Sequence, residues 1–331
     1  MENNNLEQLD RTIEQAVQPM DQKSFIQVQP FDRYVANGLQ MEEAKELIKY
    51  VLVEKETTIL FGDTGLGKTT LAMQYGIDIA ESGVRVLYVN FELSQHQLAK
   101  KFPNKVLPKN FDIATINYTL MHDVTDQGLI LAEIEATALR QKAKVIIIDN
   151  LTNLCVNSKE GSEAGSIMLK LVTLRLVHDW TMLILAHVPK RKASDPLTIN
   201  DLAGSKLLSN MADNVIGLNK SKQGQADRYI IQLKYRSLPI DLNEKNVMHL
   251  KLGMSDGYLH FEQIGFSEER NHLPRSRDEY AELEMEISKE LRTPSGLSYR
   301  DIAEKLGTSL GKVQRMAQSM GLKRKSNKGN Q

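Results

Sequence analysis

The sequence predicts an α/β fold: a mostly parallel sheet with antiparallel strands at one edge, followed by a small all-helical domain. Three observations lead to this prediction. Between residues 57 and 188, short aliphatic runs alternate with stretches of helical periodicity. After residue 214 the chain changes to short apolar runs separated by turn residues. After residue 297 it changes again, to two closely spaced helical patterns.

The alternating region sets the order of the elements. Residues 42–53 have apolar residues at helical spacing, so we expect a helix that leads into the first strand. Aliphatic runs predict strands at residues 57–62, 85–92, 144–150 and 181–188. Helical patterns predict connecting helices over residues 68–81, 125–142 and 163–180. This alternation is typical of a parallel sheet covered on both faces.

The region after residue 214 predicts shorter strands. Its apolar runs lie at residues 214–218, 229–236, 249–253 and 258–266. We expect these strands to extend the sheet antiparallel at one edge. The Ser-Asp-Gly sequence at residues 255–257 has the composition of a hairpin turn between the last two.

Composition suggests the domain boundaries. Residues 1–40 are polar without strong periodicity and predict an N-terminal arm, either partly disordered or docked on a neighbouring molecule. Residues 41–266 form the predicted core. Residues 267–278, with few apolar residues and Pro274, predict a linker. Residues 279–331 then form a helix-turn-helix domain with a basic tail.

Composition and charge narrow the function classes. The chain is 41% hydrophobic and 25% charged, and no apolar run approaches the roughly 20 residues of a membrane span. The lack of such a run predicts no membrane partner, and the single cysteine, Cys155, cannot form an internal disulfide, which fits a cytoplasmic protein. The neutral chain is asymmetric: residues 291–331 carry a net charge of +7 and the remainder −7. A basic end indicates a nucleic-acid partner, although a solubilising tail has the same charge.

Residues 62–70, GDTGLGKTT, fit the phosphate-loop pattern G-x-x-x-x-G-K-[S/T] between a predicted strand and a predicted helix. The glycines let backbone N–H groups point at phosphate oxygens, and the helix N-terminus favours anions. Lys68 is expected to reach the β- and γ-phosphates, and the Thr69 hydroxyl is expected to bind Mg²⁺. The predicted phosphate-binding residues are Gly62, Asp63, Thr64, Gly65, Leu66, Gly67, Lys68, Thr69 and Thr70.

Two predicted strands end in a carboxylate. Asp149 follows the run of residues 145–148 and precedes Asn150, where many nucleotide-hydrolysing strands carry a second acid. Conditional on the phosphate loop, Asp149 is predicted to hold the metal together with Thr69. Glu92 ends the strand of residues 85–92, at the sheet edge where ligands bind in such folds. It is either the base that activates water or a residue near the N-cap of a helix that starts at Ser94.

The phosphate loop, Glu92, and Asp149 without an adjacent Glu resemble the RecA-like ATPases. Residues 91–101, FELSQHQLAKK, are more similar to the DnaB/RepA-type hexameric helicases, whose second strand ends in a Glu followed by a Gln- and Leu-rich helix. This resemblance covers residues 45–265. It implies a RecA-like P-loop core, ATP and Mg²⁺ as cofactors, and Glu92 as the catalytic base.

The resemblance also implies roles for three residues further along the chain. His187, at the end of the strand of residues 181–188, matches the position of a polar γ-phosphate sensor; otherwise it is a satisfied histidine at a strand end. Lys234 and Arg236 match a Lys-x-Arg pattern whose side chains reach the γ-phosphate of the neighbouring subunit. They share one face of a strand. An edge strand with solvated charges is the alternative.

Two loops are expected to face the centre of such a ring, at residues 152–165 and 189–201. The second contains Lys190, Arg191 and Lys192, which suit non-specific contact with single-stranded DNA. A solvated charged loop has the same composition.

Residues 297–322 have a helix-turn-helix pattern. Ala303 is small where two helices cross, Gly307 permits the turn, and Val313 packs the second helix back. Ser309 is the expected N-cap of that helix. The residues expected to face duplex DNA are Lys312, Gln314, Arg315 and Gln318. A helical packing or interaction module is the alternative.

Taken together, these features predict an ATP-hydrolysing DNA-binding motor, a DnaB/RepA-like helicase or replication ATPase of a plasmid or other mobile element. We expect a homo-oligomer, a hexamer by the resemblance, with single-stranded DNA in the ring and duplex DNA at the helix-turn-helix. Two alternatives stay open: a non-motor DNA-binding regulator that ATP assembles, and a kinase built on the same loop.

Overall fold

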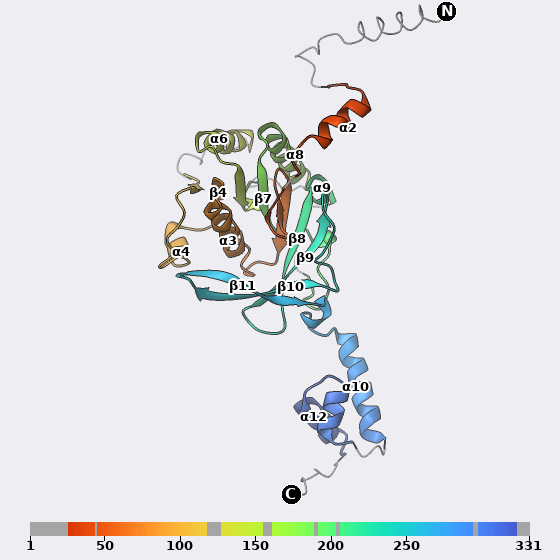
Figure 1. Cartoon of the computed structure of the whole chain (residues 1–331). Helices are drawn as coiled ribbons and strands as arrows, with labels where there is room; N and C mark the ends of the chain where they lie inside the picture. Colours follow the sequence, from red (N-terminus) through yellow and green to blue (C-terminus); the bar gives the residue numbers. More distant parts are fainter. Residues whose placement is uncertain are drawn as a thin grey trace, which may run out of the picture. The chain divides into compact units, whose positions relative to one another are not determined.

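The computed structural model describes residues 26–43, 45–117, 127–154, 161–188, 191–202, 206–293 and 297–322 (Figure 1). The chain divides into a unit of residues 1–44 and a unit of residues 45–331. In the first unit, helix α2 (Phe31–Leu39) begins after Pro30 and buries none of its residues.

The predicted α/β fold class is confirmed. Within the described residues, nine strands form one sheet in the order β11-β10-β9-β8-β3-β7-β6-β4-β5. The strands between β5 and β8 pair in parallel. Their bounds are β3 (Thr57–Gly62), β4 (Val86–Asn90), β5 (Phe111–Thr115), β6 (Val145–Asp149), β7 (Thr181–His187) and β8 (Asn214–Lys220).

The antiparallel edge is made by β9 (Asp227–Tyr235), β10 (Val247–Ser255) and β11 (Tyr258–Ser267). The predicted hairpin between the last two strands is confirmed, because Ser255 pairs with Tyr258 and Asp256 and Gly257 have positive φ. The first of the four late runs differs from the prediction. It forms β8, which runs parallel to β3 and is antiparallel only to β9.

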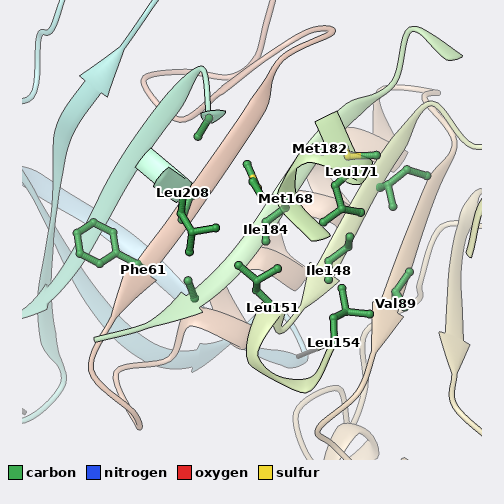
Figure 2. Close-up of a cluster of buried hydrophobic side chains, with 14 of the residues drawn as sticks. Phe61, Val89, Ile148, Leu151, Leu154, Met168, Leu171, Met182, Ile184 and Leu208 are labelled. Carbon is green, nitrogen blue, oxygen red and sulfur yellow. The ribbon is translucent and has the colours of Figure 1, made fainter. Parts of the chain in front are cut away.

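Alternate residues of the central strands enter two separate cores, so both faces of the sheet are covered. On one face Ile146 and Ile148 pack under helices α6 (Gln127–Arg140), α7 (Leu151–Leu154), α8 (Gly161–His178) and α9 (Lys206–Met211). Figure 2 shows this cluster, with Met168 and Leu171 of α8 lying over Ile148 and Ile184. On the other face Val145 and Ile147 pack with helix α3 (Lys68–Glu81). Burial on both faces explains why these strands are aliphatic throughout.

The helix predicted for residues 42–53 is wrong. The structure has a small hairpin there, β1 (Glu46–Ile48) and β2 (Leu52–Val53), with Tyr50 in the left-handed region at φ 66°. The carboxylate of Glu46 accepts hydrogen bonds from the Tyr50 N–H at 2.8 Å and the Tyr235 hydroxyl at 2.7 Å. Val51, Leu52 and Val53 are all buried. Contacts with the sheet therefore override the helical spacing.

The segment predicted as a linker, residues 267–278, is largely structured. It contains the end of β11, the short helix η2 (Glu269–Asn271) and the start of helix α10 (Arg277–Arg292). Glu269 and His272 are buried. Ser276 and Glu279 form a capping box at the start of α10, which is a sequence signal for a helix rather than a linker.

Three helices make a separate C-terminal core: α10, α11 (Tyr299–Lys305) and α12 (Leu310–Ser319). Ala303 and Val313 are buried between them, Gly307 has φ 55°, and the Ser309 side chain caps α12. Leu283, Ile287 and Leu291 of α10 complete this core. In the part of the chain that the structure describes, no helix has the length and apolar character needed to span a membrane.

Candidate active site

The phosphate loop lies between β3 and α3, as its pattern predicts. Gly65 and Gly67 have positive φ, at 80° and 99°, and Gly67 is the N-cap of α3. A Cβ at Gly62 would clash with the carbonyl oxygen of Leu218, and a Cβ at Gly67 would lie 2.8 Å from Phe261 Cζ. The loop therefore requires glycine at these positions for conformation or for space. The N-terminus of α3 follows directly, so its backbone N–H groups are placed where they can bind a phosphate.

Strand pairing brings the predicted side chains to this edge of the sheet. Gly62 pairs with His187 in the register of β3 and β7, and Asn90 pairs with Asp149 in the register of β4 and β6. The carboxyl ends of four neighbouring parallel strands thus meet beside the loop.

Lys68 is 6% exposed and its ammonium group lies inside the loop. Its Nζ donates to the carbonyl oxygens of Gly62 at 2.7 Å and Asp63 at 3.0 Å. Burial lowers the pKa of Lys68, and the negative charge of Asp149 opposes that shift. A phosphate group would offer this buried cation a stronger acceptor than the two neutral carbonyls.

Thr69 and Asp149 form the predicted metal pair. The Thr69 hydroxyl donates to Asp149 Oδ2 at 2.7 Å, and the Tyr88 hydroxyl donates to the same oxygen at 2.7 Å. Burial raises the pKa of Asp149, while the hydrogen bonds from Tyr88 and Thr69 oppose that shift. A hydroxyl and a carboxylate are oxygen ligands of the kind that Mg²⁺ prefers, so the donor set fits this ion.

Such an ion would depend on few protein ligands. The described residues contain no group of three or more His, Cys, Asp or Glu side chains able to hold a metal. Mg²⁺ usually keeps several waters and binds through one or two protein ligands plus substrate phosphates, which matches this pair.

Glu92 lies just beyond the end of β4, and its carboxylate turns towards β6. Asn150 Nδ2 donates to Glu92 Oε2 at 2.9 Å. Asn90 Oδ1 accepts the backbone N–H groups of Glu92 at 3.3 Å and Leu93 at 3.0 Å. Ser94 and Gln97 form the capping box of α4 (Gln95–Ala99), so Glu92 is an exposed residue two positions before that N-cap, and its role as the base stays a prediction.

His187, the last residue of β7, lies between the loop and Glu92. Its Nδ1 is 3.3 Å from Lys68 Nζ and 3.4 Å from Thr64 Oγ1, and its Nε2 is 3.1 Å from Asn150 Nδ2. Burial and the charge of Lys68 lower the pKa of His187, which favours the neutral ring. The structure therefore brings Lys68, His187 and Glu92 into one cluster.

Two cationic residues of this site were missed at the level of sequence. Arg228 is 7% exposed in β9, and its Nε donates to the loop carbonyl of Leu66 at 3.0 Å. Lys101 Nζ donates to Thr70 Oγ1 at 3.0 Å. Nothing local marks either residue, because β9 also contains Asp227, Gln232 and Lys234 beside Arg228.

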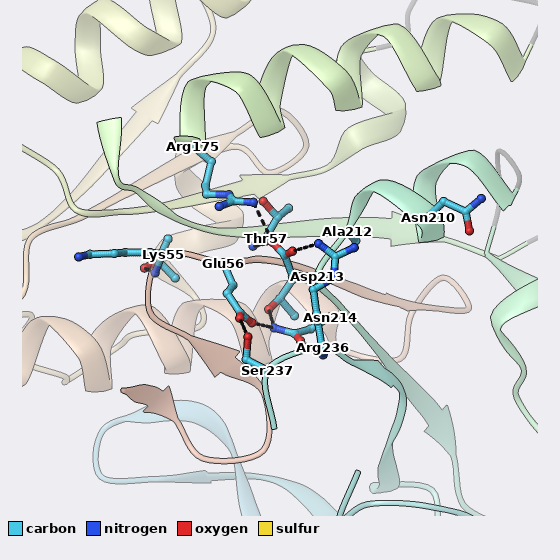
Figure 3. A network of polar contacts seen from close by, with 12 residues as sticks. Lys55, Glu56, Thr57, Arg175, Asn210, Ala212, Asp213, Asn214, Arg236 and Ser237 are labelled. Carbon is cyan, nitrogen blue, oxygen red and sulfur yellow. Dashed lines mark hydrogen bonds and ion pairs between the residues drawn. The ribbon is translucent and has the colours of Figure 1, made fainter. Parts of the chain in front are cut away.

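Lys234 and Arg236 lie near the amino ends of the parallel strands β3 and β8, whereas the phosphate loop of their own chain lies at the carboxyl end of β3. Lys234 Nζ donates to the carbonyl oxygens of Ser209, Asn210 and Ala212 at the end of α9, at 2.6 to 3.2 Å. Figure 3 shows Arg236 beside Asp213, with Arg175 on the other side of that carboxylate. These ion pairs measure 2.8 Å from Arg236 and 3.1 Å from Arg175. Neither Lys234 nor Arg236 forms part of the site in its own chain.

The proposed DNA-contacting loops are described only in part. Lys190 and Cys155 lie outside the described residues, and α7 and α8 occupy much of residues 152–165. Lys192 is exposed as expected. Arg191 differs from the expectation: it is partly buried, and its Nη1 donates to the carbonyl of Asp195 in its own loop at 2.6 Å.

On α12, Gln314, Arg315 and Gln318 are exposed, as predicted. Lys312 differs, because its ammonium group lies 3.5 Å from a Glu284 oxygen and 4.4 Å from the ring centre of Tyr280, both on α10. The sequence did not reveal this contact because α10 was not predicted there.

Comparison with known proteins finds several that are similar to part of this chain. Curated relatives include the DNA repair protein RadA of Campylobacter jejuni, 25% identical over 197 residues, which covers 58% of this chain and 39% of the relative. RadA of Streptococcus pneumoniae is 25% identical over 182 residues, covering 54% and 39%. The chain thus spans about two fifths of the length of these relatives. A solved KaiC-like protein of Pyrococcus horikoshii is 19% identical, with a TM-score of 0.49, over 64% of this chain and 91% of its own.

A family model described as "AAA domain" matches residues 25–193, just over half of the chain. The matched segment contains the phosphate loop, Glu92, Asp149 and His187. The chain belongs to this AAA domain family of P-loop proteins.

Proposed function

We propose that this protein is an ATP-hydrolysing, DNA-binding motor: a DnaB/RepA-like helicase or replication ATPase of a mobile element that works as a ring, expected to be a hexamer. The observation that carries the ATPase part is the Thr69–Asp149 contact of 2.7 Å, with Glu92 two residues beyond the end of the neighbouring strand β4. A metal ligand pair and a separate carboxylate at one phosphate loop are what hydrolysis of a γ-phosphate requires.

Each residue of the site has a distinct role in this proposal. The loop N–H groups and Lys68 bind the phosphates, and Thr69 with Asp149 hold Mg²⁺, which neutralises phosphate charge when bound. Glu92 takes a proton from the attacking water. His187 contacts the γ-phosphate, because it lies beside Lys68.

The DNA part rests on two supports. The relatives are named as DNA repair proteins. The C-terminal helices expose Gln314, Arg315 and Gln318 on one helix, and long polar donors of this kind suit contact with DNA. Among the described residues of the loop after β7, Lys192 is exposed and basic, and we propose that it contacts single-stranded DNA.

The first prediction tests the ATPase. Lys68→Ala should abolish turnover and weaken nucleotide binding, because the buried cation at the β- and γ-phosphates is lost. Glu92→Gln should keep ATP binding and lower kcat by about 10² or more, as loss of a general base does. Turnover is measured as phosphate release, with and without single-stranded DNA, and ATP binding is measured separately. Unimpaired turnover in Glu92→Gln contradicts the proposed base.

The same assay separates the alternatives. A motor should hydrolyse ATP faster with single-stranded DNA and displace a strand from a tailed duplex. A regulator that ATP only assembles should show neither effect. A kinase should transfer the phosphate to an acceptor instead of releasing it to water.

A further inference from the structure

Asn150 follows Asp149 at the end of β6 and is 3% exposed. Its side chain lies between the two groups that flank the scissile phosphate in the proposed function. Nδ2 is 2.9 Å from Glu92 Oε2 and 3.1 Å from His187 Nε2. A buried amide that touches both groups is in a position to fix their geometry.

The orientation of this amide follows from its hydrogen bonds. Oδ1 accepts the backbone N–H of Asn153 at 3.1 Å, so the NH₂ group must face Glu92 and His187. One hydrogen goes to Glu92 Oε2, and the other is directed at His187 Nε2. On the other side of the ring, Nδ1 lies 3.3 Å from the Lys68 ammonium group and 3.4 Å from Thr64 Oγ1, so the ring connects the amide of Asn150 with the phosphate loop.

Glu92 is therefore held at two points. Asn90 fixes its backbone through the N–H groups of Glu92 and Leu93, and Asn150 fixes one carboxylate oxygen. A hydrogen bond to Oε2 leaves Oε1 to accept the proton of a water. One anchor on the backbone and one on the carboxylate disfavour rotamers that would point the carboxylate away from the phosphate.

The chemistry of the amide explains why an acid would not serve here. A carboxylate at position 150 would lie beside Asp149 and against Glu92, adding a third negative charge to the cluster. Like charges at hydrogen-bond distance repel and disfavour the ionised form that a base needs. An amide of the same shape supplies two donors without charge.

We propose that Asn150 is a positioning residue that aligns the carboxylate of Glu92 with the phosphate loop through His187. This inference rests on the proposed role of Glu92 as the base. Asn150 acts through Glu92 and itself touches neither the phosphate nor the water.

The test compares three variants of the full-length protein by ATPase kinetics and ATP-analogue binding. Asn150→Asp keeps the shape but loses the donors, and Asn150→Ala loses both. Both should lower kcat by about ten- to a hundredfold, the range for misplaced catalytic groups, with unchanged KM and analogue affinity. Asn219→Ala is the matched control: it removes a buried amide that donates to Tyr229 instead, and should leave kcat unchanged.

A double-mutant cycle shows whether Asn150 acts through Glu92. In single-turnover assays on a Glu92→Gln background, Asn150→Ala should cause no further loss, because the group it positions is already inactive. An equal loss in both backgrounds overturns the inference. So does full turnover in Asn150→Asp with a folded protein by circular dichroism.

The failure of the inference and that of the proposed function look different. If Glu92→Gln is inactive while Asn150→Asp is fully active, only the positioning role is wrong. If Glu92→Gln retains full turnover, the proposed base is wrong and the positioning role falls with it.

Discussion

His272 is a completely buried histidine near the end of the core. Its Nε2 is 2.7 Å from Ser267 Oγ and its Nδ1 is 2.8 Å from Ser221 Oγ. Burial is the main cause that lowers the pKa of His272 from 6.5 to about 4, and the nearby His249 and Lys222 act in the same direction. The ring is therefore neutral in the folded protein at any pH above that value.

This histidine predicts an acid-sensitive core. Between pH 6.5 and 4 the unfolded state binds the proton and the folded state does not, so the free energy of unfolding falls as pH drops through that window. From pH 7 to pH 5 the loss should be about 2 kcal/mol. Urea unfolding followed by fluorescence of the single tryptophan, the buried Trp180, measures it. His272→Gln can keep a polar contact but has no group that titrates in this range, so its free energy of unfolding should fall by about 2 kcal/mol less between pH 7 and pH 5. An equal fall in both proteins would contradict the proposed role of His272.

At the scale of elements, the sequence predicted best where a pattern is local. The phosphate loop, with its flanking strand and helix, needs only its own residues. The hairpin β1–β2 could not be predicted, because it depends on Tyr235, 189 residues away from Glu46. Helix α10 was missed because its apolar residues, Leu283, Ile287 and Leu291, are few, although their spacing of four and its capping box were present.

The candidate site shows the same limit. The positions of Asp149 and His187 were predictable because each ends a recognisable strand, and that of Glu92 because it lies two residues beyond one. The contacts of Asn150 with Glu92, Arg228 with Leu66 and Lys101 with Thr70 were not. They depend on the order of strands in the sheet and on side-chain direction, which the spacing of residues along the chain does not specify.

The C-terminal helices carry a prediction at this scale. Arg315 is exposed on α12, whereas Lys312 is held by Glu284 and Tyr280. Arg315→Ala should therefore weaken duplex DNA binding more than Lys312→Ala. If Arg315 contacts a base, the loss should be about 1–3 kcal/mol on a preferred site and small on random DNA. Binding titrations of both variants on a preferred site and on random DNA, at two salt concentrations, measure these losses.

A truncated chain provides the control for that measurement. Because Glu269 and His272 belong to the core, the chain should end after Pro274 and not before them. It should keep ATPase activity and lose most duplex affinity. Full duplex affinity in this truncated chain would mean that the C-terminal helices bind another protein.

At the scale of the whole molecule, the site is incomplete in one chain if Lys234 and Arg236 act on a neighbour. Both side chains lie at the amino end of β8, away from their own phosphate loop. Arg236 is the better candidate, because its side chain is 56% exposed and can exchange Asp213 for a phosphate, whereas Lys234 caps α9 with three hydrogen bonds. Lys234→Ala should therefore lower stability as well as turnover.

Mixing subunits tests this arrangement. Arg236→Ala and Lys68→Ala should each be inactive as pure proteins, with ATP affinity retained in Arg236→Ala. In a mixture, an Arg236→Ala subunit supplies an intact loop and its Lys68→Ala neighbour supplies an intact arginine, so some interfaces regain both. ATPase activity should rise from near zero to a maximum at intermediate ratios. An Arg175→Ala protein is the matched control: Arg175 contacts the same Asp213 but is only 14% exposed, so its loss should lower stability, and mixing with Lys68→Ala subunits should not raise its ATPase activity. Light scattering and affinity capture should show that mixed assemblies form. If they do form and ATPase activity stays near zero at every ratio of Arg236→Ala to Lys68→Ala, Arg236 serves only to bind Asp213 in its own chain.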